Sequence, residues 1–413
     1  MDHFRYRGSE LCAEDVPLSR IAREVGTPAF VYSSAAFEGR LSAFDRAFAG
    51  VPHLVCYSVK VASNLALLAK VARAGLGADI VSGGELFRAL RAGIPAGKVV
   101  FSGVGKTAAE IAEALEAGIM MFNVESGPEL DLISRIARDK GKRAPVALRV
   151  NPDVDPGTHP YVATGLKESK FGVPIGEALG LYARARDDAA LEAVGLDCHI
   201  GSQLTSVSPF VAAVGRLKAL LASLAGQGVK VRFLDLGGGL GITYDAETPP
   251  GPAEYAEEIV RAVGREDLVL VLEPGRVVAG NSCVLLVGVL YEKVTPEKRF
   301  VVTDGAMNDL IRPSLYGAFH GIVPVAENGG VPSPANVVGP VCESGDFLAK
   351  DRPLPPVGPG DLLAVRSAGA YGFSMSSNYN SRPRSAEVLV EGASFRVIRA
   401  RETREDLIRG ENI

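Results

Sequence analysis

The chain has 413 residues, 47% hydrophobic and 22% charged, which is enough for a large buried core and two domains. The formal net charge is -4 and no long block of Lys or Arg occurs, so nucleic acid and anionic membrane surfaces are not expected partners. The N-terminus lacks an apolar signal region, and no apolar stretch is long enough to predict a membrane span. We therefore expect a cytoplasmic protein.

Neither the cysteines nor the histidines form a recognisable metal or disulfide pattern. The five cysteines are odd in number, widely spaced and without a C-x-x-C pair, which is typical of reduced thiols. The five histidines include no H-x-x-x-H or H-E-x-x-H arrangement. The sequence therefore predicts no metal site.

In chain order, residues 1–27 are polar and mixed, and 28–32 predict a strand that is followed by a helix over 35–48. From His53 onward, apolar strand-like runs alternate with helical stretches, many of them rich in Ala. The expected strands are 54–57, 78–81, 99–101, 120–124, 146–150, 194–199, 231–236 and 268–272. The expected helices include 85–92, 108–117, 130–139, 176–186 and 210–225. Eight strand-helix units predict a closed (β/α)8 TIM barrel.

Three helix starts, at Ser82, Thr107 and Ser126, fit the S/T-x-x-E capping box. A long polar stretch, 151–172, separates the fifth strand from the next helix, and a loop of this length at a barrel strand end is usually functional. These features mark the places where strands give way to helices.

After Gly275 the alternation stops and short β-like runs broken by Pro and Gly follow, at 282–291, 300–303, 362–365 and 386–390. They predict a C-terminal β-sandwich or β-barrel domain, joined by the N-terminal strand. We expect a barrel domain over 34–280 and a β domain made of 1–33 and 281–413.

A lysine follows the first barrel strand at a strand-to-helix turn, where active sites gather in parallel α/β folds. Strand alternation places Cys56, Ser58 and Lys60 on one face, and an inward lysine is costly unless it is used. On its own, the segment favours the interpretation of Lys60 as a solvated loop lysine, which is the usual place for this residue type. The functional interpretation depends on the residues at the other strand ends.

Three later strands end in residues that could take part in binding or catalysis. His199 closes the sixth strand, and Gly237–Gly239 after the seventh would let backbone N–H groups face an anion. Glu273 ends an apolar run, where a carboxylate needs a cationic partner, and Arg276 offers a second anion contact. Each also fits a structural role: a core histidine, a flexible turn or a solvent-exposed glutamate. Because all of them follow barrel strands, they should lie together with Lys60 at the rim formed by the carboxyl ends of the strands. This common position favours an active site.

The β region adds Arg312 and Tyr316, Cys342 beside Glu343, and Tyr371 between small residues. Each alone fits a surface loop, and Cys342 fits an inert buried thiol.

Together these segments resemble the fold type III pyridoxal-phosphate decarboxylases, and within them the branch that acts on meso-diaminopimelate. The motifs are YSVKVA at 57–62, HIGSQ at 199–203, GGGLG at 237–241, EPGR at 273–276, the 312–316 segment, CESGD at 342–346 and GAYG at 369–372. They follow the family's order over nearly the whole chain. The family usually has Ala-Asn after the lysine, where this chain has Val61 and Ala62.

The resemblance implies pyridoxal 5'-phosphate as cofactor, held by Lys60 as a Schiff base. Glu273 would pair with the pyridine nitrogen, and His199 would stack on the ring. The remaining implied cofactor-binding residues are Ser202, Gly237, Gly238, Gly239, Pro274, Gly275, Arg276 and Tyr371.

The implied reaction is decarboxylation of meso-2,6-diaminopimelate to L-lysine and CO2, the last step of lysine biosynthesis. Lys60, His199 and Cys342 would be catalytic, with Cys342 donating the proton to Cα. Cys342 and Glu343 would come from the partner subunit of a homodimer with shared active sites. The implied substrate-binding residues are Arg276, Arg312, Tyr316, Glu343 and Tyr371.

Three alternatives stay open at this point. A related decarboxylase of the same fold could act on another basic or D-configured amino acid; ornithine and lysine enzymes carry Asp where Glu343 stands. A non-catalytic homologue could bind the cofactor alone, although Lys60, Glu273 and Cys342 are all present. An alanine racemase would need a tyrosine base opposite the lysine, and the Cys342 motif argues against it.

Overall fold

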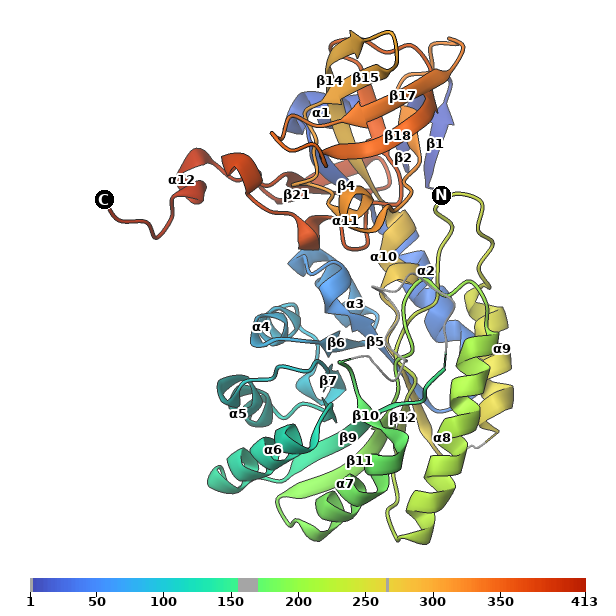
Figure 1. Ribbon diagram of the computed structural model, residues 1–413, viewed down its shortest axis with the longest axis vertical. Helices are drawn as coiled ribbons and strands as arrows, with labels where there is room; N and C mark the ends of the chain where they lie inside the picture. Colours follow the sequence, from blue (N-terminus) through green and yellow to red (C-terminus); the bar gives the residue numbers. More distant parts are fainter. Residues whose placement is uncertain (1–2, 155–169, 265–266) are drawn as a thin grey trace. The chain divides into compact units, whose positions relative to one another are not determined.

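The computed structural model describes residues 3–154, 170–264 and 267–413 (Figure 1). The chain divides into two compact units. The barrel unit comprises Leu41–Ile242 and Thr248–Val277, and the β unit comprises Met1–Arg40, Thr243–Glu247 and Val278–Ile413. Most of the long polar stretch after the fifth barrel strand, residues 155–169, lies outside the described residues.

The barrel unit contains the predicted TIM barrel. Its parallel strands pair in chain order, and the last pairs with the first, which closes the barrel. The strands are β5 (His53–Ser58), β6 (Gly77–Ile80), β7 (Val99–Phe101), β8 (Met121–Val124), β9 (Ala144–Asn151), β11 (Leu191–Asp197), β12 (Phe233–Asp235) and β13 (Val269–Leu272). A short strand, β10 (Val173–Pro174), extends the sheet beside β9. The predicted fold class is confirmed.

Helices alternate with the strands along the chain, one of them before β5, and most cover the outside of the barrel (Figure 1). They are α2 (Ser34–Ala47), α3 (Leu65–Arg73), α4 (Gly83–Arg91), α5 (Ala108–Ala117), α6 (Gly127–Asp139), α7 (Ile175–Asp187), α8 (Ser208–Gly226), α9 (Pro252–Val263) and α10 (Arg276–Ala279). The barrel interior is closed by small and apolar side chains from several strands, among them Cys56, Val100, Met121, Ala147, Val194 and Val271. This packed interior leaves the strand ends as the place for polar chemistry.

The predicted capping boxes form in two different ways. Thr107 makes the full reciprocal pair at the start of α5. Ser82 accepts the N–H of Glu85 (3.2 Å), but the Glu85 carboxylate accepts the N–H of Val81, one residue before the cap. The start of α6 at Ser126 repeats this second arrangement. The glutamates therefore also fix the backbone that leaves the strand.

One expectation about apolar stretches is wrong. Helix α8 has 19 residues and is long and apolar enough, by length and composition, to span a membrane. Its apolar residues nevertheless form a packing face that includes Phe210, Val214, Leu217 and Leu221. The helix contacts its neighbours α7 and α9, as the other barrel helices contact theirs.

The β unit begins with structure that the sequence did not indicate. Residues 1–27 were expected to be mixed, but β1 (Phe4–Arg7), β2 (Glu10–Ala13) and β3 (Val16–Pro17) form a small antiparallel sheet. Helix α1 (Leu18–Val25) follows it. Strands of two to four residues are too short to produce a detectable alternation of apolar side chains.

The main sheet of the β unit has nine strands. They are β4 (Ala29–Ser33), β14 (Cys283–Val294), β15 (Arg299–Thr303), β16 (Ile322–Pro324), β17 (Ser333–Val338), β18 (Phe347–Leu354), β19 (Leu362–Val365), β20 (Ala386–Glu391) and β21 (Ser394–Arg399). The N-terminal strand β4 is buried along its length, antiparallel to β14 and parallel to β20. The expectation that this strand joins the C-terminal β domain is therefore confirmed. Two short helices, α11 (Arg312–Tyr316) and α12 (Arg404–Leu407), complete the unit.

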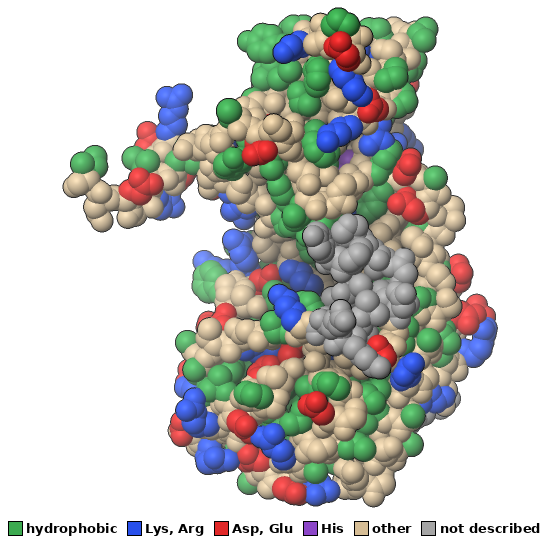
Figure 2. Space-filling view, viewed as in Figure 1, with side chains coloured by type: hydrophobic (Ala, Val, Ile, Leu, Met, Phe, Trp, Pro, Cys, Tyr) green, Lys and Arg blue, Asp and Glu red, His purple; other side chains and the backbone are tan. Residues whose placement is uncertain are grey.

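Positive and negative side chains are interspersed over the described face shown in Figure 2. A mixed surface of this kind agrees with the small net charge of the chain.

Candidate active site

Lys60 lies on a tight turn at the carboxyl end of β5. The strand ends at Ser58, and Val59–Val61 form a single 3-10 turn. Strand alternation therefore ends before the lysine, yet Lys60 lies on the same side as Ser58, as expected, because both side chains contact Asp79. Its side chain reaches Asp79, placing Nζ 2.6 Å from Asp79 Oδ2.

Asp79 lies in strand β6 of the barrel, one residue before its end, and has no exposed surface. Its Oδ2 also accepts a hydrogen bond from Ser58 Oγ (2.8 Å), while its Oδ1 has no hydrogen-bond partner among the described residues. An ion pair between a buried carboxylate and a partly exposed amine keeps the lysine at the rim. The solvated-loop interpretation of Lys60 is therefore excluded.

Glu273 follows strand β13 and is only 4% exposed, so it does not emerge into solvent. Its Oε1 lies 3.5 Å from both Ser102 Oγ and Asn123 Nδ2. Burial, followed by the charges of Asp235 and Asp79, raises the pKa of Glu273 well above its usual value, although Lys60 opposes this. The carboxylate lies where a further cation would stabilise it.

Asn123, in strand β8, links this glutamate to a second buried acid. Its Nδ2 lies 3.1 Å from Asp235 Oδ2 and 3.1 Å from Ser102 Oγ. Burial and the charge of Asp197 raise the pKa of Asp235, and burial with the charge of Glu273 raises that of Asp197. Several acids thus share the interior below the rim, which is suited to a positively charged ring nitrogen.

His199 lies two residues beyond β11, which ends at Asp197, so the expected strand to 199 is two residues too long. Its Nδ1 accepts the N–H of Gly238 (3.1 Å), which orients the ring. Burial, followed by the charges of Arg149 and Lys60, lowers the pKa of His199 well below its usual value. A neutral, oriented imidazole is suited to stacking on an aromatic ring.

The glycine run after β12 is a packed turn rather than a flexible one. Gly237 has φ +63° and donates its N–H to Asp235 Oδ1 (3.0 Å). A Cβ on Gly238 would collide with the carbonyl oxygen of Glu273, and Gly239 has φ +116°. A tightly packed turn without side chains can direct its backbone N–H groups at a phosphate group.

The segment after Glu273 packs on the lysine turn. The carbonyl of Pro274 accepts the N–H of Ser58 (3.2 Å), and a Cβ on Gly275 would collide with Val61. Val61, where the family usually has Ala, is therefore accommodated by Gly275. The departure from the family pattern leaves the turn intact.

Arg276 begins α10 and is 7% exposed. Its Nε and Nη2 lie 3.1 and 3.0 Å from Ser202 Oγ. This places a buried guanidinium and a hydroxyl at the same rim as the glycine run, which suits an anion. The structure thus brings together all the predicted site residues of the barrel unit at the carboxyl ends of its strands.

In the β unit, Arg312 and Tyr316 are the first and last residues of α11, one turn apart on the same side. Ser314 Oγ donates to the carbonyl of Gly345 (2.5 Å), which ties this helix to the loop that carries Cys342. Arg312 is buried, at 6% exposure.

Cys342 is exposed, so the alternative interpretation as a buried thiol is excluded. Its N–H donates to Asn380 Oδ1 (2.7 Å), and Asp346 holds the same loop by accepting the N–H of Val341 (2.8 Å). Glu343 is also exposed, and its Oε1 accepts the N–H of Gly345 (3.1 Å). Backbone contacts fix this loop and leave both side chains at the surface of the chain.

Tyr371 lies in a turn of the β unit with φ +57°. A Cβ on the next residue, Gly372, would collide with the carbonyl of Ala368. The glycine that follows this tyrosine is therefore required by the turn.

Sequence reasoning missed Asp79, Asn123 and Arg149. Arg149 is 7% exposed and its Nη1 lies 2.9 Å from Glu125 Oε1. Each of these polar residues interrupts an apolar strand, a signal that would have identified them.

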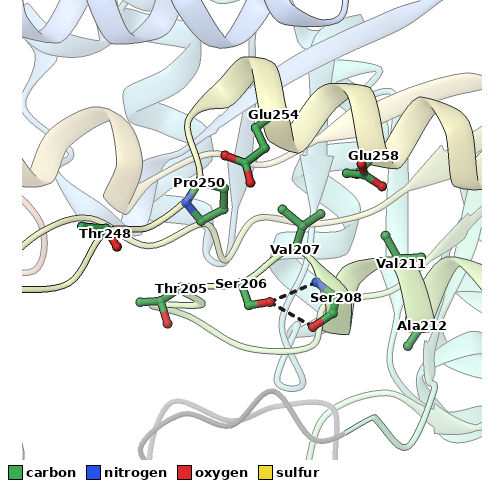
Figure 3. Close-up of a pocket in the computed structure, with 10 residues that line it drawn as sticks. All are labelled: Thr205, Ser206, Val207, Ser208, Val211, Ala212, Thr248, Pro250, Glu254 and Glu258. Atoms are coloured by element: carbon green, nitrogen blue, oxygen red, sulfur yellow. Dashed lines mark hydrogen bonds between the residues drawn. The ribbon is translucent and has the colours of Figure 1, made fainter.

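A separate groove lies on the barrel unit between the start of α8 and α9 (Figure 3). Hydroxyl groups and two glutamates line it, and Ser206 Oγ lies 2.9 Å from Ser208 Oγ. The lining residues are Thr205, Ser206, Val207, Ser208, Val211, Ala212, Thr248, Pro250, Glu254 and Glu258. No predicted site residue is among them, so this groove is distinct from the rim that carries Lys60.

Residues 34–280 match the family described as "Pyridoxal-dependent decarboxylase, pyridoxal binding domain". The chain belongs to this family of pyridoxal-dependent decarboxylases. Within it, the chain is 55% identical to diaminopimelate decarboxylase of Pseudomonas aeruginosa, over 100% of this chain and 99% of that protein. It is 51% identical to the diaminopimelate decarboxylase of Vibrio cholerae, over 97% of each.

A solved structure gives the same assignment. The diaminopimelate decarboxylase of Helicobacter pylori complexed with L-lysine matches with a TM-score of 0.92 and 44% identity, covering 95% of this chain and 98% of that one.

Proposed function

We propose that the chain is a carboxy-lyase that uses pyridoxal 5'-phosphate to convert meso-2,6-diaminopimelate to L-lysine and CO2, the last step of lysine biosynthesis. The observation that carries the proposal is the rim around Lys60, with its buried acids and packed glycine turn. It occurs in a chain that resembles diaminopimelate decarboxylases along its length.

The bound cofactor supplies an aromatic ring that accepts the electron pair left by departing CO2. Lys60 is the amine that holds the cofactor's aldehyde carbon, and Asp79, 2.6 Å from Nζ, orients that amine. Glu273 keeps a proton at the ring nitrogen, because pairing with a cation relieves the cost of its own burial. His199, whose pKa is lowered by burial, would contact the cofactor ring as a neutral imidazole.

The phosphate is assigned to the backbone of Gly237–Gly239, Gly275 and Arg276 and to the hydroxyl of Tyr371, with Ser202 and Pro274 beside it. The packed glycine turn supports this assignment, because a side chain there would collide with the neighbouring backbone. We assign residues 34–280 to the cofactor-binding domain, and 1–33 with 281–413 to the β domain.

The far end of the substrate carries a second amino acid centre. We assign its carboxylate to Arg276, Arg312 and Tyr316 and its ammonium to Glu343, with Tyr371 as a further substrate-binding residue. The burial of Arg312 supports this, because a carboxylate contact is stronger where water is excluded. Such a contact would discriminate against substrates without a distal carboxylate.

Cys342 is assigned as the acid that protonates Cα, and it acts, with Glu343, in the active site of the partner subunit of a homodimer. The exposure of both side chains supports this, because a residue that serves another subunit must lie at the surface of its own chain. The protein is expected to act in the cytoplasm.

A substrate panel tests the proposal. Purified holoenzyme should release CO2 from meso-diaminopimelate with an equal amount of L-lysine, and at least about a hundredfold less from L-lysine or L-ornithine. Equal rates with ornithine would indicate a decarboxylase for other basic amino acids. Cofactor binding without release from any substrate would indicate a non-catalytic homologue.

A further inference from the structure

His320 lies in the β unit, four residues after α11, and has no exposed surface. Its Nε2 lies 2.8 Å from Arg312 Nη1, and its Nδ1 lies 2.8 Å from the carbonyl oxygen of Arg366. The imidazole thus joins the guanidinium of α11 to the backbone just after strand β19.

The two contacts fix the protonation of His320. A carbonyl oxygen only accepts hydrogen bonds, so Nδ1 carries the proton, and a guanidinium only donates, so Nε2 is the bare acceptor. His320 is therefore neutral and in a single tautomer. A protonated imidazole would present a second cation to Arg312 and would have no lone pair for it.

Tyr244 holds the same guanidinium from another side. The Arg312 Cζ lies 4.7 Å from the centre of the Tyr244 ring, and this ring meets the His320 ring edge to face at 5.4 Å. Three side chains from separate segments therefore contact one another, which confines the long arginine side chain to a narrow range of directions.

We propose that His320 is a positioning residue that aims Arg312 at the carboxylate on the far end of the substrate. The inference rests on the proposed function, which assigns that carboxylate to Arg312. Because His320 is neutral, it orients the guanidinium without cancelling its positive charge, as a carboxylate in the same place would. The guanidinium has five N–H donors, of which His320 engages one at Nη1.

Two ligands isolate the contact. L-Lysine keeps the carboxylate at the far end after CO2 has left, whereas cadaverine has the same carbon chain and no carboxylate. Two variants isolate the acceptor: His320→Gln keeps an acceptor near the position of Nε2, and His320→Asn keeps only a donor near Nδ1. The four dissociation constants, with those of the wild type, are measured by calorimetry on the holoenzyme.

We expect His320→Asn to weaken L-lysine binding by about tenfold and leave cadaverine binding unchanged, because a hydrogen bond to a charged group is lost. His320→Gln should recover most of the loss. The KM for meso-diaminopimelate should rise in His320→Asn while kcat changes little. The cofactor absorbance and Tm of each variant verify that the fold is intact.

Equal weakening of both ligands in His320→Asn, or of neither, would overturn the positioning role and leave the proposed reaction standing. If the wild type binds L-lysine no more tightly than cadaverine, the contact of Arg312 with the carboxylate is itself wrong. Failure of the wild type to release CO2 from meso-diaminopimelate would separately refute the proposed function.

Discussion

The barrel rim and the Cys342 loop are built in opposite ways. Around Lys60, the supporting side chains come from different strands and are buried, with Asp79 at 0% and Glu273 at 4% exposure. Around Cys342, the loop is held by backbone hydrogen bonds, and its side chains face outward. The rim is a preorganised site of buried side chains, whereas the loop holds its backbone in place and leaves Cys342 and Glu343 exposed. Changes at the rim should therefore alter cofactor binding, and changes in the loop should alter turnover alone.

The largest effect is expected for Lys60→Ala. Turnover should fall by about 1000-fold or more, because the amine that holds the cofactor and moves protons is removed. The absorbance of covalently held cofactor should disappear from the purified protein. Lys142→Ala, an exposed lysine before the start of β9, is the control and should retain both. Persistence of covalent cofactor in Lys60→Ala would show that another lysine carries it.

Cys342→Ala should lower turnover without affecting cofactor binding, unlike a change at the rim. Turnover should fall by about 100-fold, typical of the loss of a general acid, while the absorbance of the bound cofactor stays at the wild-type level. In the native protein without substrate, thiol alkylation should modify Cys342 well before the four buried cysteines. Unchanged turnover would exclude the thiol as the proton donor.

Subunit mixing tests whether the loop serves a second chain. Lys60→Ala and Cys342→Ala, each with about 1% of the wild-type activity or less alone, should regain about one quarter of it when unfolded and refolded together, because half of the dimers then contain one complete site. Cys342→Ala mixed with itself is the control. If no activity returns although dimers form, each chain builds its site alone.

Asn123→Ala tests the buried support of the rim with a smaller expected effect. The amide lies within hydrogen-bond distance of Asp235 and of Ser102, and its loss leaves buried oxygen atoms without this donor. Cofactor affinity should weaken by about tenfold, measured by absorbance titration. Asn328→Ala, which removes an exposed amide in the β unit, is the control. Wild-type affinity in Asn123→Ala would show that the cofactor does not depend on the acid cluster.

The sequence was sufficient to predict the barrel because the strands are apolar runs that alternate with helical stretches, three of which begin at a recognisable cap. Lys60, His199 and Glu273 could be placed at one rim for the same reason. Asp79 and Asn123 could not be assigned partners, because their contacts arise only when strands distant in sequence close into a barrel. The exposure of Cys342 depends on how its loop is held by Asn380, 38 residues away.

The β unit also contains a buried acid, Asp309. Its titration tests whether burial or the hydrogen bonds of its turn determine its pKa. Asp309 is 1% exposed, and its carboxylate accepts hydrogen bonds from Ser385 Oγ and from the N–H of Ala306 (3.1 Å). Burial outweighs these donors and raises its pKa from 3.8 to about 6.

The unfolded chain therefore releases this proton at a lower pH than the folded protein. The stability contributed by protonated Asp309 is complete below about pH 4 and is lost as the pH rises through 6, by on the order of 2 to 3 kcal/mol. Asp309→Asn cannot ionise, so the Tm of the wild type should fall relative to that of the variant between pH 4 and 7. A constant difference between the two curves of Tm against pH would reflect only the hydrogen-bond acceptor lost in Asp309→Asn. A difference that changes with pH would reflect the ionisation of Asp309. Parallel curves would mean that Asp309 is ionised throughout this range, and that the hydrogen bonds of its turn outweigh its burial.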